Sequence, residues 1–324
     1  MKRSGWIALV LCALALAAGG ELAHWASRAL FARSGPILFV PKSVGPEMEF
    51  WQVVGQGVDA AAKELGVEAR TEGAASETDV DGQIRLVERA IPQKPRAIVL
   101  AAADYERLVP VAERIRKAGI PLVLVDSGLK ADVADSFVGT DNEAAGRQVA
   151  EALLADLPPA GTVAIVSFVK GSSTAMEREN GVRSRLGASD VRVLGTLYSD
   201  GSPDKAYALT KELLQRMPDL AGIAGLNEPS TVGAARAVQE LGAAGRVRLI
   251  GFDSSTEEIR YLEEGAIQAI VVQKPFNMGY LAIRTAVDIS NGRPVEKRIR
   301  TGSVVIDKRT MYSKENQKLL FPFR

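Results

Sequence analysis

The chain has 324 residues, of which 47% are hydrophobic and 24% are charged, and its formal net charge is +1. This composition is ordinary for a globular protein and excludes a largely disordered chain, while the length suits about two domains. A net charge near zero gives no electrostatic reason to expect nucleic acid or an anionic membrane surface as a partner.

Cysteine and histidine are almost absent from the sequence. The single cysteine, Cys12, and the single histidine, His24, both lie close to the N-terminus. The body of the chain therefore offers no thiol nucleophile, no Cys/His metal cluster and no Ser-His-Asp triad. We accordingly expect no enzyme activity, no bound metal and no cofactor.

The N-terminal segment is typical of an export signal. Two basic residues precede an apolar core at residues 6–18, and a pair of glycines follows it. This core is shorter than the roughly 20 apolar residues that a membrane-spanning helix needs. We assign residues 1–35 to a signal peptide and linker and expect a periplasmic or extracytoplasmic protein. An uncleaved membrane anchor is the alternative.

Short apolar runs then alternate with segments of helical periodicity, in two series. The first series predicts strands at 37–40, 67–71, 97–102, 121–126 and 136–141, with helices at 50–66, 80–93, 105–119 and 143–157. The second predicts strands at 162–168, 191–198, 221–226, 246–252 and 268–273, with helices near 174–186 and at 204–217, 230–242, 256–265 and 277–292. Apolar strands without alternation are covered on both faces, so the pattern indicates α/β architecture with two doubly wound, Rossmann-like parallel sheets.

Polar side chains follow several predicted strands, and ligands of open parallel sheets bind beyond the carboxyl ends of the strands. These side chains are Asp104, Asp126, Thr140, Asp141, Asn227, Asp253 and Gln273, and the aromatic pair Phe50 and Trp51 begins the first helix on the same side. Each has a structural alternative, because such residues also cap helices, form turns or fill a core. Their recurrence at one end of several strands favours a site for a neutral, polyhydroxylated ligand.

The sequence resembles the ribose-binding-protein type of periplasmic sugar-binding protein, the type I family that serves ABC transporters. The similarity covers about residues 36–310 and includes FWQVVGQGVDAAAKELG, AMERENGVRSRL, LNEPSTVGAARAV and LIGFDSSTEEIRYLEEGAIQAIVVQKPFNMG. The resemblance implies two α/β lobes joined by a hinge of three crossings, near residues 126–141, 252–254 and 273–277. The N-terminal lobe would comprise residues 36–140 and 274–300, and the C-terminal lobe 141–273 and 301–324.

The resemblance also implies roles for individual residues. Phe50 and Trp51 would stack on or wall the ligand, and Asp126 and Asp253 would accept from its hydroxyls. Arg178 would donate to the ligand, and the amides of Asn227 and Gln273 would each donate and accept. Taken alone, Arg178 would be a solvated helix charge. Thr140 would line a crossover near the cleft, while Lys42 and Glu47 would add one charge of each sign near its mouth.

The sequence departs from the family where asparagines are common, at the Pro46–Glu47 region and at Ala101–Ala102. A pentose other than ribose, a hexose, a deoxy sugar, a polyol or a sugar-like signal is therefore as strongly expected as ribose itself. The predicted function is the capture of such a ligand between the lobes by a monomer and its delivery to a membrane ABC permease. The alternative is a sensory receptor that reports to a membrane kinase or chemoreceptor.

Two further alternatives fit the sequence poorly. The effector domain of a sugar-responsive repressor would need a helix-turn-helix where this chain has its apolar leader. A nucleotide-dependent enzyme would need a phosphate-binding glycine motif, and neither GxGxxG after the first strand nor GxxxxGK[ST] occurs.

Overall fold

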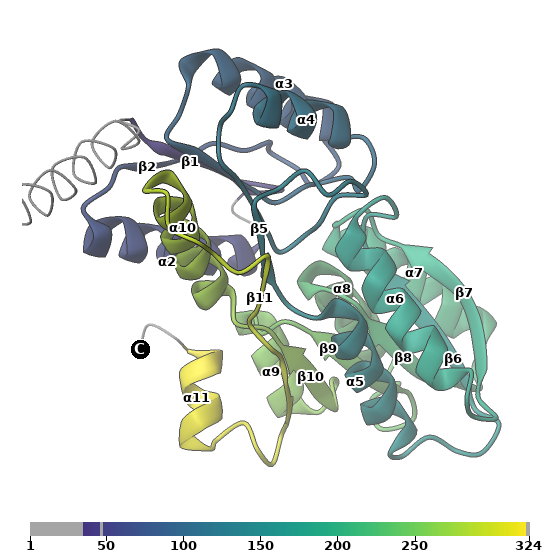
Figure 1. Cartoon of the computed structure of the whole chain (residues 1–324). Coiled ribbons are helices and arrows are strands. Elements are labelled where there is room, and N and C mark those ends of the chain that lie inside the picture. Colours follow the sequence, from purple (N-terminus) through teal and green to yellow (C-terminus); the bar gives the residue numbers. More distant parts are fainter. Residues whose placement is uncertain (1–34, 46–47, 322–324) are drawn as a thin grey trace, which may run out of the picture.

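The computed structural model describes residues 35–45 and 48–321. In this part of the chain, two six-stranded sheets form the centres of two lobes, which lie one above the other in Figure 1. The two doubly wound sheets predicted from the sequence are confirmed. The predicted signal segment, Cys12, His24 and Glu47 lie outside the described residues.

The first sheet has the strand order β11-β5-β4-β3-β1-β2, and all its pairs are parallel. Its strands are β1 (Ile37–Val40), β2 (Ala69–Thr71), β3 (Ala97–Leu100), β4 (Leu122–Val125), β5 (Ser136–Gly139) and β11 (Arg298–Arg300). The helices of this lobe are α2 (Glu49–Leu65), α3 (Val80–Ala90), the short 3-10 helix η1 (Ile91–Gln93), α4 (Val109–Lys117) and α10 (Pro275–Ser290).

The second sheet has the order β12-β10-β9-β8-β6-β7, and only β12 runs antiparallel to its neighbour. Its strands are β6 (Thr162–Ser167), β7 (Arg192–Tyr198), β8 (Leu220–Gly225), β9 (Arg248–Phe252), β10 (Ala269–Val272) and β12 (Val304–Asp307). The helices are α5 (Asn142–Leu154), α6 (Ser173–Leu186), α7 (Pro203–Arg216), α8 (Glu228–Glu240), α9 (Thr256–Glu264) and α11 (Lys314–Leu320).

The central strands of each sheet are buried on both faces, as their unbroken apolar runs predict. In β1, Ile37 and Phe39 enter the core shared with α2 and α10, whereas Leu38 and Val40 enter the core shared with α3 and α4. Successive strand residues point to opposite faces, so a strand covered on both sides must be apolar throughout. The same division separates the two cores of the second lobe.

The chain changes lobe after β5, after β10 and between β11 and β12. The crossing expected near residues 252–254 is wrong, because β9 and β10 are neighbours in the same sheet. The third crossing is instead the short segment 301–303, which separates the edge strands of the two sheets. Three parallel connections of this kind allow two lobes to move about a common hinge.

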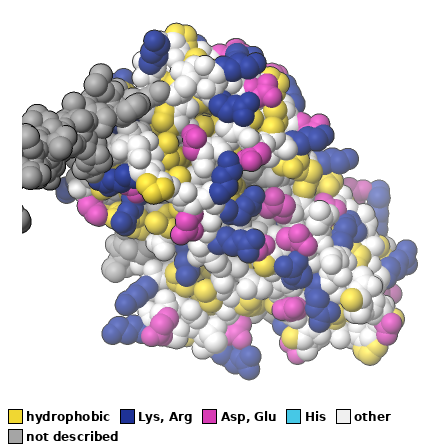
Figure 2. All heavy atoms as spheres, viewed as in Figure 1, with side chains coloured by type: hydrophobic (Ala, Val, Ile, Leu, Met, Phe, Trp, Pro, Cys, Tyr) yellow, Lys and Arg dark blue, Asp and Glu magenta, His cyan; other side chains and the backbone are white. Residues whose placement is uncertain are grey.

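The surface carries mixed charge. Figure 2 shows Lys and Arg side chains interspersed with Asp and Glu over the visible face of both lobes. No helix in the described residues combines the length and the apolar character that a membrane crossing requires.

Candidate functional site

The two aspartates that end buried strands occupy equivalent places in the two lobes. Asp126 follows β4 and Asp253 follows β9, and both have left-handed backbones, with φ of 62° and 86°. The backbone N–H of Asp126 donates to Val138, and that of Asp253 donates to Val271, each at 2.9 Å. Left-handed backbones are costly for residues other than glycine, although Asp tolerates them better than most. Each strand therefore ends in a constrained turn that directs a carboxylate away from the sheet.

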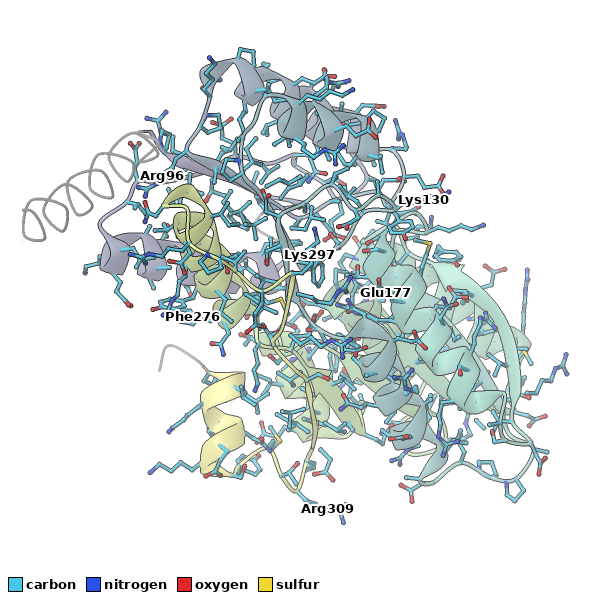
Figure 3. The ribbon with its side chains drawn as sticks, in the orientation of Figure 1. Arg96, Lys130, Glu177, Phe276, Lys297 and Arg309 are labelled. Atoms are coloured by element: carbon cyan, nitrogen blue, oxygen red, sulfur yellow. The ribbon has the colours of Figure 1, made fainter. Side chains whose placement is uncertain are left out.

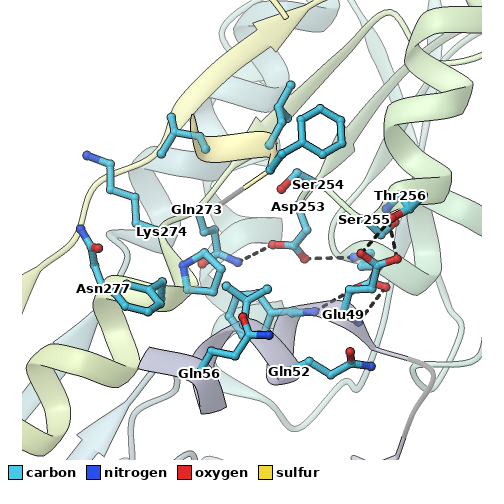
Figure 4. A pocket seen from close by; sticks show the side chains of 18 of the residues that line it. Glu49, Gln52, Gln56, Asp253, Ser254, Ser255, Thr256, Gln273, Lys274 and Asn277 are labelled. Atoms are coloured by element: carbon cyan, nitrogen blue, oxygen red, sulfur yellow. Dashed lines mark hydrogen bonds between the residues drawn. The ribbon is translucent and has the colours of Figure 1, made fainter. Parts of the chain in front are cut away.

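Asp253 is held by hydrogen bonds to both of its carboxylate oxygens. One of its oxygens accepts a hydrogen bond from Gln273 Nε2 at 2.7 Å, and the other accepts from the backbone N–H of Glu228 at 3.0 Å (Figure 4). Gln273 Oε1 in turn accepts from Thr140 Oγ1 at 2.8 Å. Thr140 follows β5 and Gln273 follows β10, so this chain of hydrogen bonds ties the first two crossings to the carboxylate.

Lys42 links the two lobes across the cleft. Its ammonium lies 2.8 Å from Asp126 Oδ2 and donates to Ser172 and Thr174 of the opposite lobe, at 3.2 and 3.0 Å. The ammonium also lies 5.9 Å from the ring centroid of Trp51. Lys42 and Asp126 are both almost completely buried, so each offsets much of the desolvation cost of the other.

Arg178 provides the cationic group of the second lobe. Its Nε donates to Asn142 Oδ1 at 2.9 Å, its Nη1 donates to the carbonyl of Leu226 at 2.8 Å, and its guanidinium lies 3.8 Å from the ring centroid of Phe252. Burial lowers the pKa of Arg178, while the charges of Asp253 and other carboxylates oppose that shift. Arginine remains charged under such conditions, so it is a fixed donor.

Two glutamates cap helices across the lobe boundary. Glu228, at the start of α8, accepts from the backbone N–H groups of Glu49 and Phe50 at the start of α2, both at 3.1 Å. Glu49 reciprocates by accepting from the backbone N–H and the hydroxyl of Thr256 at the start of α9, each at 3.2 Å (Figure 4). Carboxylates at helix N-termini satisfy free N–H groups and complement the helix dipole. Burial, together with the charge of Asp253, raises the pKa of Glu228 to about 8.

These side chains surround one small cavity between the lobes, with a volume of about 20 Å³. Its lining consists of Lys42, Met48, Phe50, Trp51, Glu77, Asp126, Phe168, Thr174, Arg178, Asn227, Asp253 and Gln273. A larger cavity of about 630 Å³ adjoins it and shares Phe50, Asp253 and Gln273. Phe276, which also lines the larger cavity, lies where the two lobes meet (Figure 3).

The lining combines carboxylates, a guanidinium, an ammonium and two amides with three aromatic rings. Such groups accept from and donate to hydroxyls, while the rings can cover the C–H face of a sugar. Within the described ranges, no group of three histidine, cysteine or carboxylate side chains could hold a metal ion. The arrangement can bind a hydroxyl-rich molecule.

A family model described as a periplasmic binding protein domain matches residues 37–294. The chain belongs to the periplasmic binding protein family. The curated relatives include the D-ribose/D-allose-binding protein of Pseudomonas aeruginosa, which is 30% identical over 80% of this chain and 83% of that protein. Members of this family work outside the cytoplasm, as the sequence predicted.

Solved periplasmic binding proteins have the same fold. An ABC transporter solute-binding protein from Agrobacterium vitis with bound D-fucose has a TM-score of 0.86 and 33% identity, covering 88% of this chain and 100% of its own. A carbohydrate transporter solute-binding protein from Agrobacterium radiobacter, in complex with D-arabinose, has a TM-score of 0.85 and 30% identity, with 89% and 99% covered. These relatives are transport proteins and do not support the sensory-receptor alternative.

The structure brings most of the predicted site residues of this binding protein together. The cavity is lined by Lys42, Phe50, Trp51, Asp126, Arg178, Asn227, Asp253 and Gln273. Thr140 is outside the lining and acts on it through Gln273. Asp104 is outside the lining and accepts from the backbone N–H groups of Glu106 and Arg107, so it forms a turn ahead of α4, which is the turn alternative considered for such residues.

Four residues of the lining were missed from the sequence: Met48, Glu77, Phe168 and Thr174. Glu77 lies in the loop that follows β2, and Phe168 and Thr174 flank the loop that follows β6. Both loops leave the carboxyl ends of parallel strands, which is the signal that could have identified them. Asn227 was predicted and lines the cavity, and its side chain also caps the N-terminus of α8.

Proposed function

We propose that this periplasmic binding protein captures a small neutral sugar between its lobes and delivers it to an ABC permease. The observation that carries the proposal is the convergence of Asp126 from one lobe with Arg178 and Asp253 from the other on a single buried cavity. Hydrogen bonds to charged groups contribute about 1.5–3 kcal/mol each, so a few of them support selective binding of hydroxyl groups.

The charges of the lining favour an uncharged ligand. Lys42 pairs with Asp126, and Arg178 lies among carboxylates that include Asp253. A ligand with a net charge would upset this balance in a region from which water is largely excluded. A sugar instead exchanges its hydroxyl hydrogen bonds with water for bonds to the same paired groups.

The conformation described is closed, and ligand entry requires it to open. A cavity of about 20 Å³ has room for roughly one water molecule, not for a sugar ring. We infer that the lobes separate at the three crossings, that the ligand enters, and that Lys42 turns from its partners as the cleft closes on the sugar. Hinge closure around a ligand is a known conformational change of two-lobed binding proteins.

We also propose the boundaries of the lobes, the oligomeric state and the role of the N-terminal segment. The N-terminal lobe comprises residues 36–140 and 274–300, and the C-terminal lobe comprises 141–273 and 301–324. The protein acts as a monomer, and the closed form presents both lobe surfaces to the permease. Residues 1–35 direct export, which N-terminal sequencing of protein isolated from the source cells would test.

A thermal-shift screen followed by calorimetry tests the binding function. D-ribose, D-allose, D-fucose and D-arabinose should be compared, because a ligand that binds only the folded form raises the melting temperature by mass action. At least one of these sugars should raise it and bind with micromolar affinity. The proposal is wrong if none of the sugars binds.

Trp51 offers an independent measurement. It is the single tryptophan after residue 35, since the other two are at positions 6 and 25. Its ring lines the cavity and lies close to Lys42, so ligand entry should change its fluorescence. In a protein that begins at residue 35, the sugar found by calorimetry should change the emission with the same affinity.

A further inference from the structure

Glu77 is a buried carboxyl group that the family resemblance does not assign to the ligand. It lies in the loop between β2 and α3, lines the small cavity, and is only 6% exposed. Its Oε1 accepts a hydrogen bond from the indole N–H of Trp51 at 2.9 Å. The carboxyl group is therefore fixed at the edge of an aromatic ring that walls the same cavity.

The second carboxyl oxygen of Glu77 accepts no hydrogen bond from the described residues. This atom, Oε2, is buried. It faces Gly201 of the opposite lobe: a Cβ atom added to that glycine would lie 3.8 Å from Oε2. Leaving a buried acceptor unsatisfied costs about 1–3 kcal/mol, and more when the group is charged. Such an atom in the wall of a ligand cavity is accounted for if a ligand supplies the missing donor.

The surroundings of Glu77 specify what kind of donor fits. Burial raises the pKa of Glu77, the charge of Lys42 and the indole N–H of Trp51 oppose that rise, and the charge of Asp126 adds to it. Arg178, from the opposite lobe, also lowers it. Two cations and two carboxylates besides Glu77 already surround the cavity, with Asp253 as the second carboxylate. An anionic ligand group would be repelled here, whereas a hydroxyl can donate without adding charge.

We propose that Glu77 is a ligand-binding residue that accepts a hydrogen bond from a sugar hydroxyl at the edge of Trp51. This inference rests on the proposed sugar-binding function and deepens it. A sugar ring against the indole face directs its hydroxyl groups outward, toward the edge where Glu77 is held. The site thereby selects neutral sugars that carry a hydroxyl at that position and rejects sugar acids and sugar phosphates.

The test compares Glu77→Ala and Glu77→Gln with the wild type by calorimetry, using D-ribose, D-allose, D-fucose and D-arabinose. For each sugar that binds the wild type, Glu77→Ala should weaken binding about tenfold, the loss of one hydrogen bond to a charged group. Glu77→Gln should weaken it by a smaller factor: the amide oxygen can still accept from Trp51, and the NH2 group, which replaces the free oxygen, can donate to the oxygen of the sugar hydroxyl. Glu77→Gln keeps the size of the side chain, so it decides the question if the alanine variant does not fold.

Glu258→Gln is the matched control. Glu258 is also a fully buried carboxyl with one unpartnered oxygen, but it does not line the cavity. This variant should keep wild-type sugar affinity whatever it does to the melting temperature. D-ribose 5-phosphate and D-galacturonate should bind the wild type at least about tenfold more weakly than the best neutral sugar.

The outcomes separate the two proposals. If the wild type binds none of the four sugars, the proposed function and this inference fail together. If it binds a sugar and both Glu77 variants keep that affinity, the inference alone fails. Binding of either anion as tightly as the best sugar overturns the selection for neutral ligands.

Discussion

Asp126 and Asp253 show how two residues can join a fold to a site. Each is the first residue after a buried strand, each has a left-handed backbone, and each directs its carboxyl group into the same cavity from a different lobe. Strained backbones of this kind persist where the surrounding structure over-determines them. The hydrogen bonds from the aspartate N–H groups to the neighbouring strands provide that constraint.

Replacing Asp253 by asparagine should weaken sugar binding about tenfold, since a neutral amide oxygen accepts more weakly than a carboxylate. Asparagine tolerates a left-handed backbone, but its NH2 group would face one of the two N–H donors that the carboxylate accepts from, so the melting temperature should also fall. Asp200→Asn is the control, because Asp200 is left-handed too but exposed and outside the cavity. Calorimetry should find a loss in the first variant only; equal affinity in both would remove Asp253 from the site.

Glu228 should make stability depend on pH. Its pKa of about 8 in the folded protein is raised above the ordinary value of 4.5, so between these values the folded state binds more protons than the unfolded state. The free energy of unfolding should therefore fall as pH rises through this window, by at most about 1.4 kcal/mol per pH unit.

Urea unfolding of the wild type and Glu228→Gln across this pH range would measure the effect. The variant cannot ionise, so its free energy of unfolding should fall less steeply with pH. The remaining slope should come from other buried carboxyl groups whose pKa values burial raises, among them Asp253, Glu258 and Glu77. An identical slope in the two proteins would contradict this role for Glu228.

At the scale of secondary structure, the elements that were missed are short and partly exposed, although the edge strands β2 and β7 were predicted. AIVL and LVLV became β3 and β4, in which every residue is buried. The missed strands β11 and β12 form the other two sheet edges. They are only three and four residues long, and both contain charged and exposed residues. The missed α11 is a short helix of mostly polar residues. Burial on two faces creates the apolar signal, and these elements lack it.

The same limit applied to the site. Asp126 and Asp253 were predictable because each directly follows a strongly apolar strand, and ligand sites lie beyond the carboxyl ends of such strands. Glu77 lies several residues beyond the end of β2, in a loop without large apolar residues of its own, so the predicted strand at 67–71 did not indicate it. The resemblance to sugar-binding proteins, and no local pattern, identified Arg178. Contacts across the cleft, such as Glu228 with α2, depend on how the lobes meet.

The packing of α2 on α10 gives a prediction about these helices. A Cβ at Gly57 would lie 2.1 Å from the carbonyl oxygen of Phe276, whereas one at Gly55 would meet nothing within 4 Å. Gly57→Ala should therefore push α10 away and lower the free energy of unfolding by roughly 1–3 kcal/mol. Gly55→Ala, in the same helix, should raise it by roughly 0.5–1 kcal/mol through helix propensity.

Urea unfolding would measure both glycine variants. The Gly57 variant should also lose sugar affinity, because α2 carries Phe50 and Trp51 into the cavity. Equal stability of the two variants would show that α10 can shift without cost.

At the scale of the whole molecule, the closed state is held by contacts that exist only when the lobes meet. Glu49 with Thr256, Glu228 with α2, and Lys42 with Ser172 and Thr174 all join the two lobes. None of them closes a sheet or fills a core, so each can break without unfolding either lobe. Their sum biases the hinge toward closure before any ligand contributes.

Glu49→Gln should shift the ligand-free protein toward the open form, since a neutral amide caps α9 less strongly than a carboxylate. Small-angle scattering should show a larger radius of gyration without sugar and a wild-type value at saturating sugar, with weaker affinity. Glu64→Gln is the control, because Glu64 lies in the same helix but bonds Tyr280 within its own lobe. An unchanged radius in the Glu49 variant would show that this cap does not bias the hinge.

The edge strand β11 has a consequence for the order in which the protein can be built. It pairs with β5, yet about 160 residues and the whole second parallel series separate the two in the chain. A ribosome must therefore finish the second sheet's five parallel strands before the first sheet can receive its last one. During synthesis one side of β5 stays unpaired until β11 is made, so until then this edge is open to pairing with another chain.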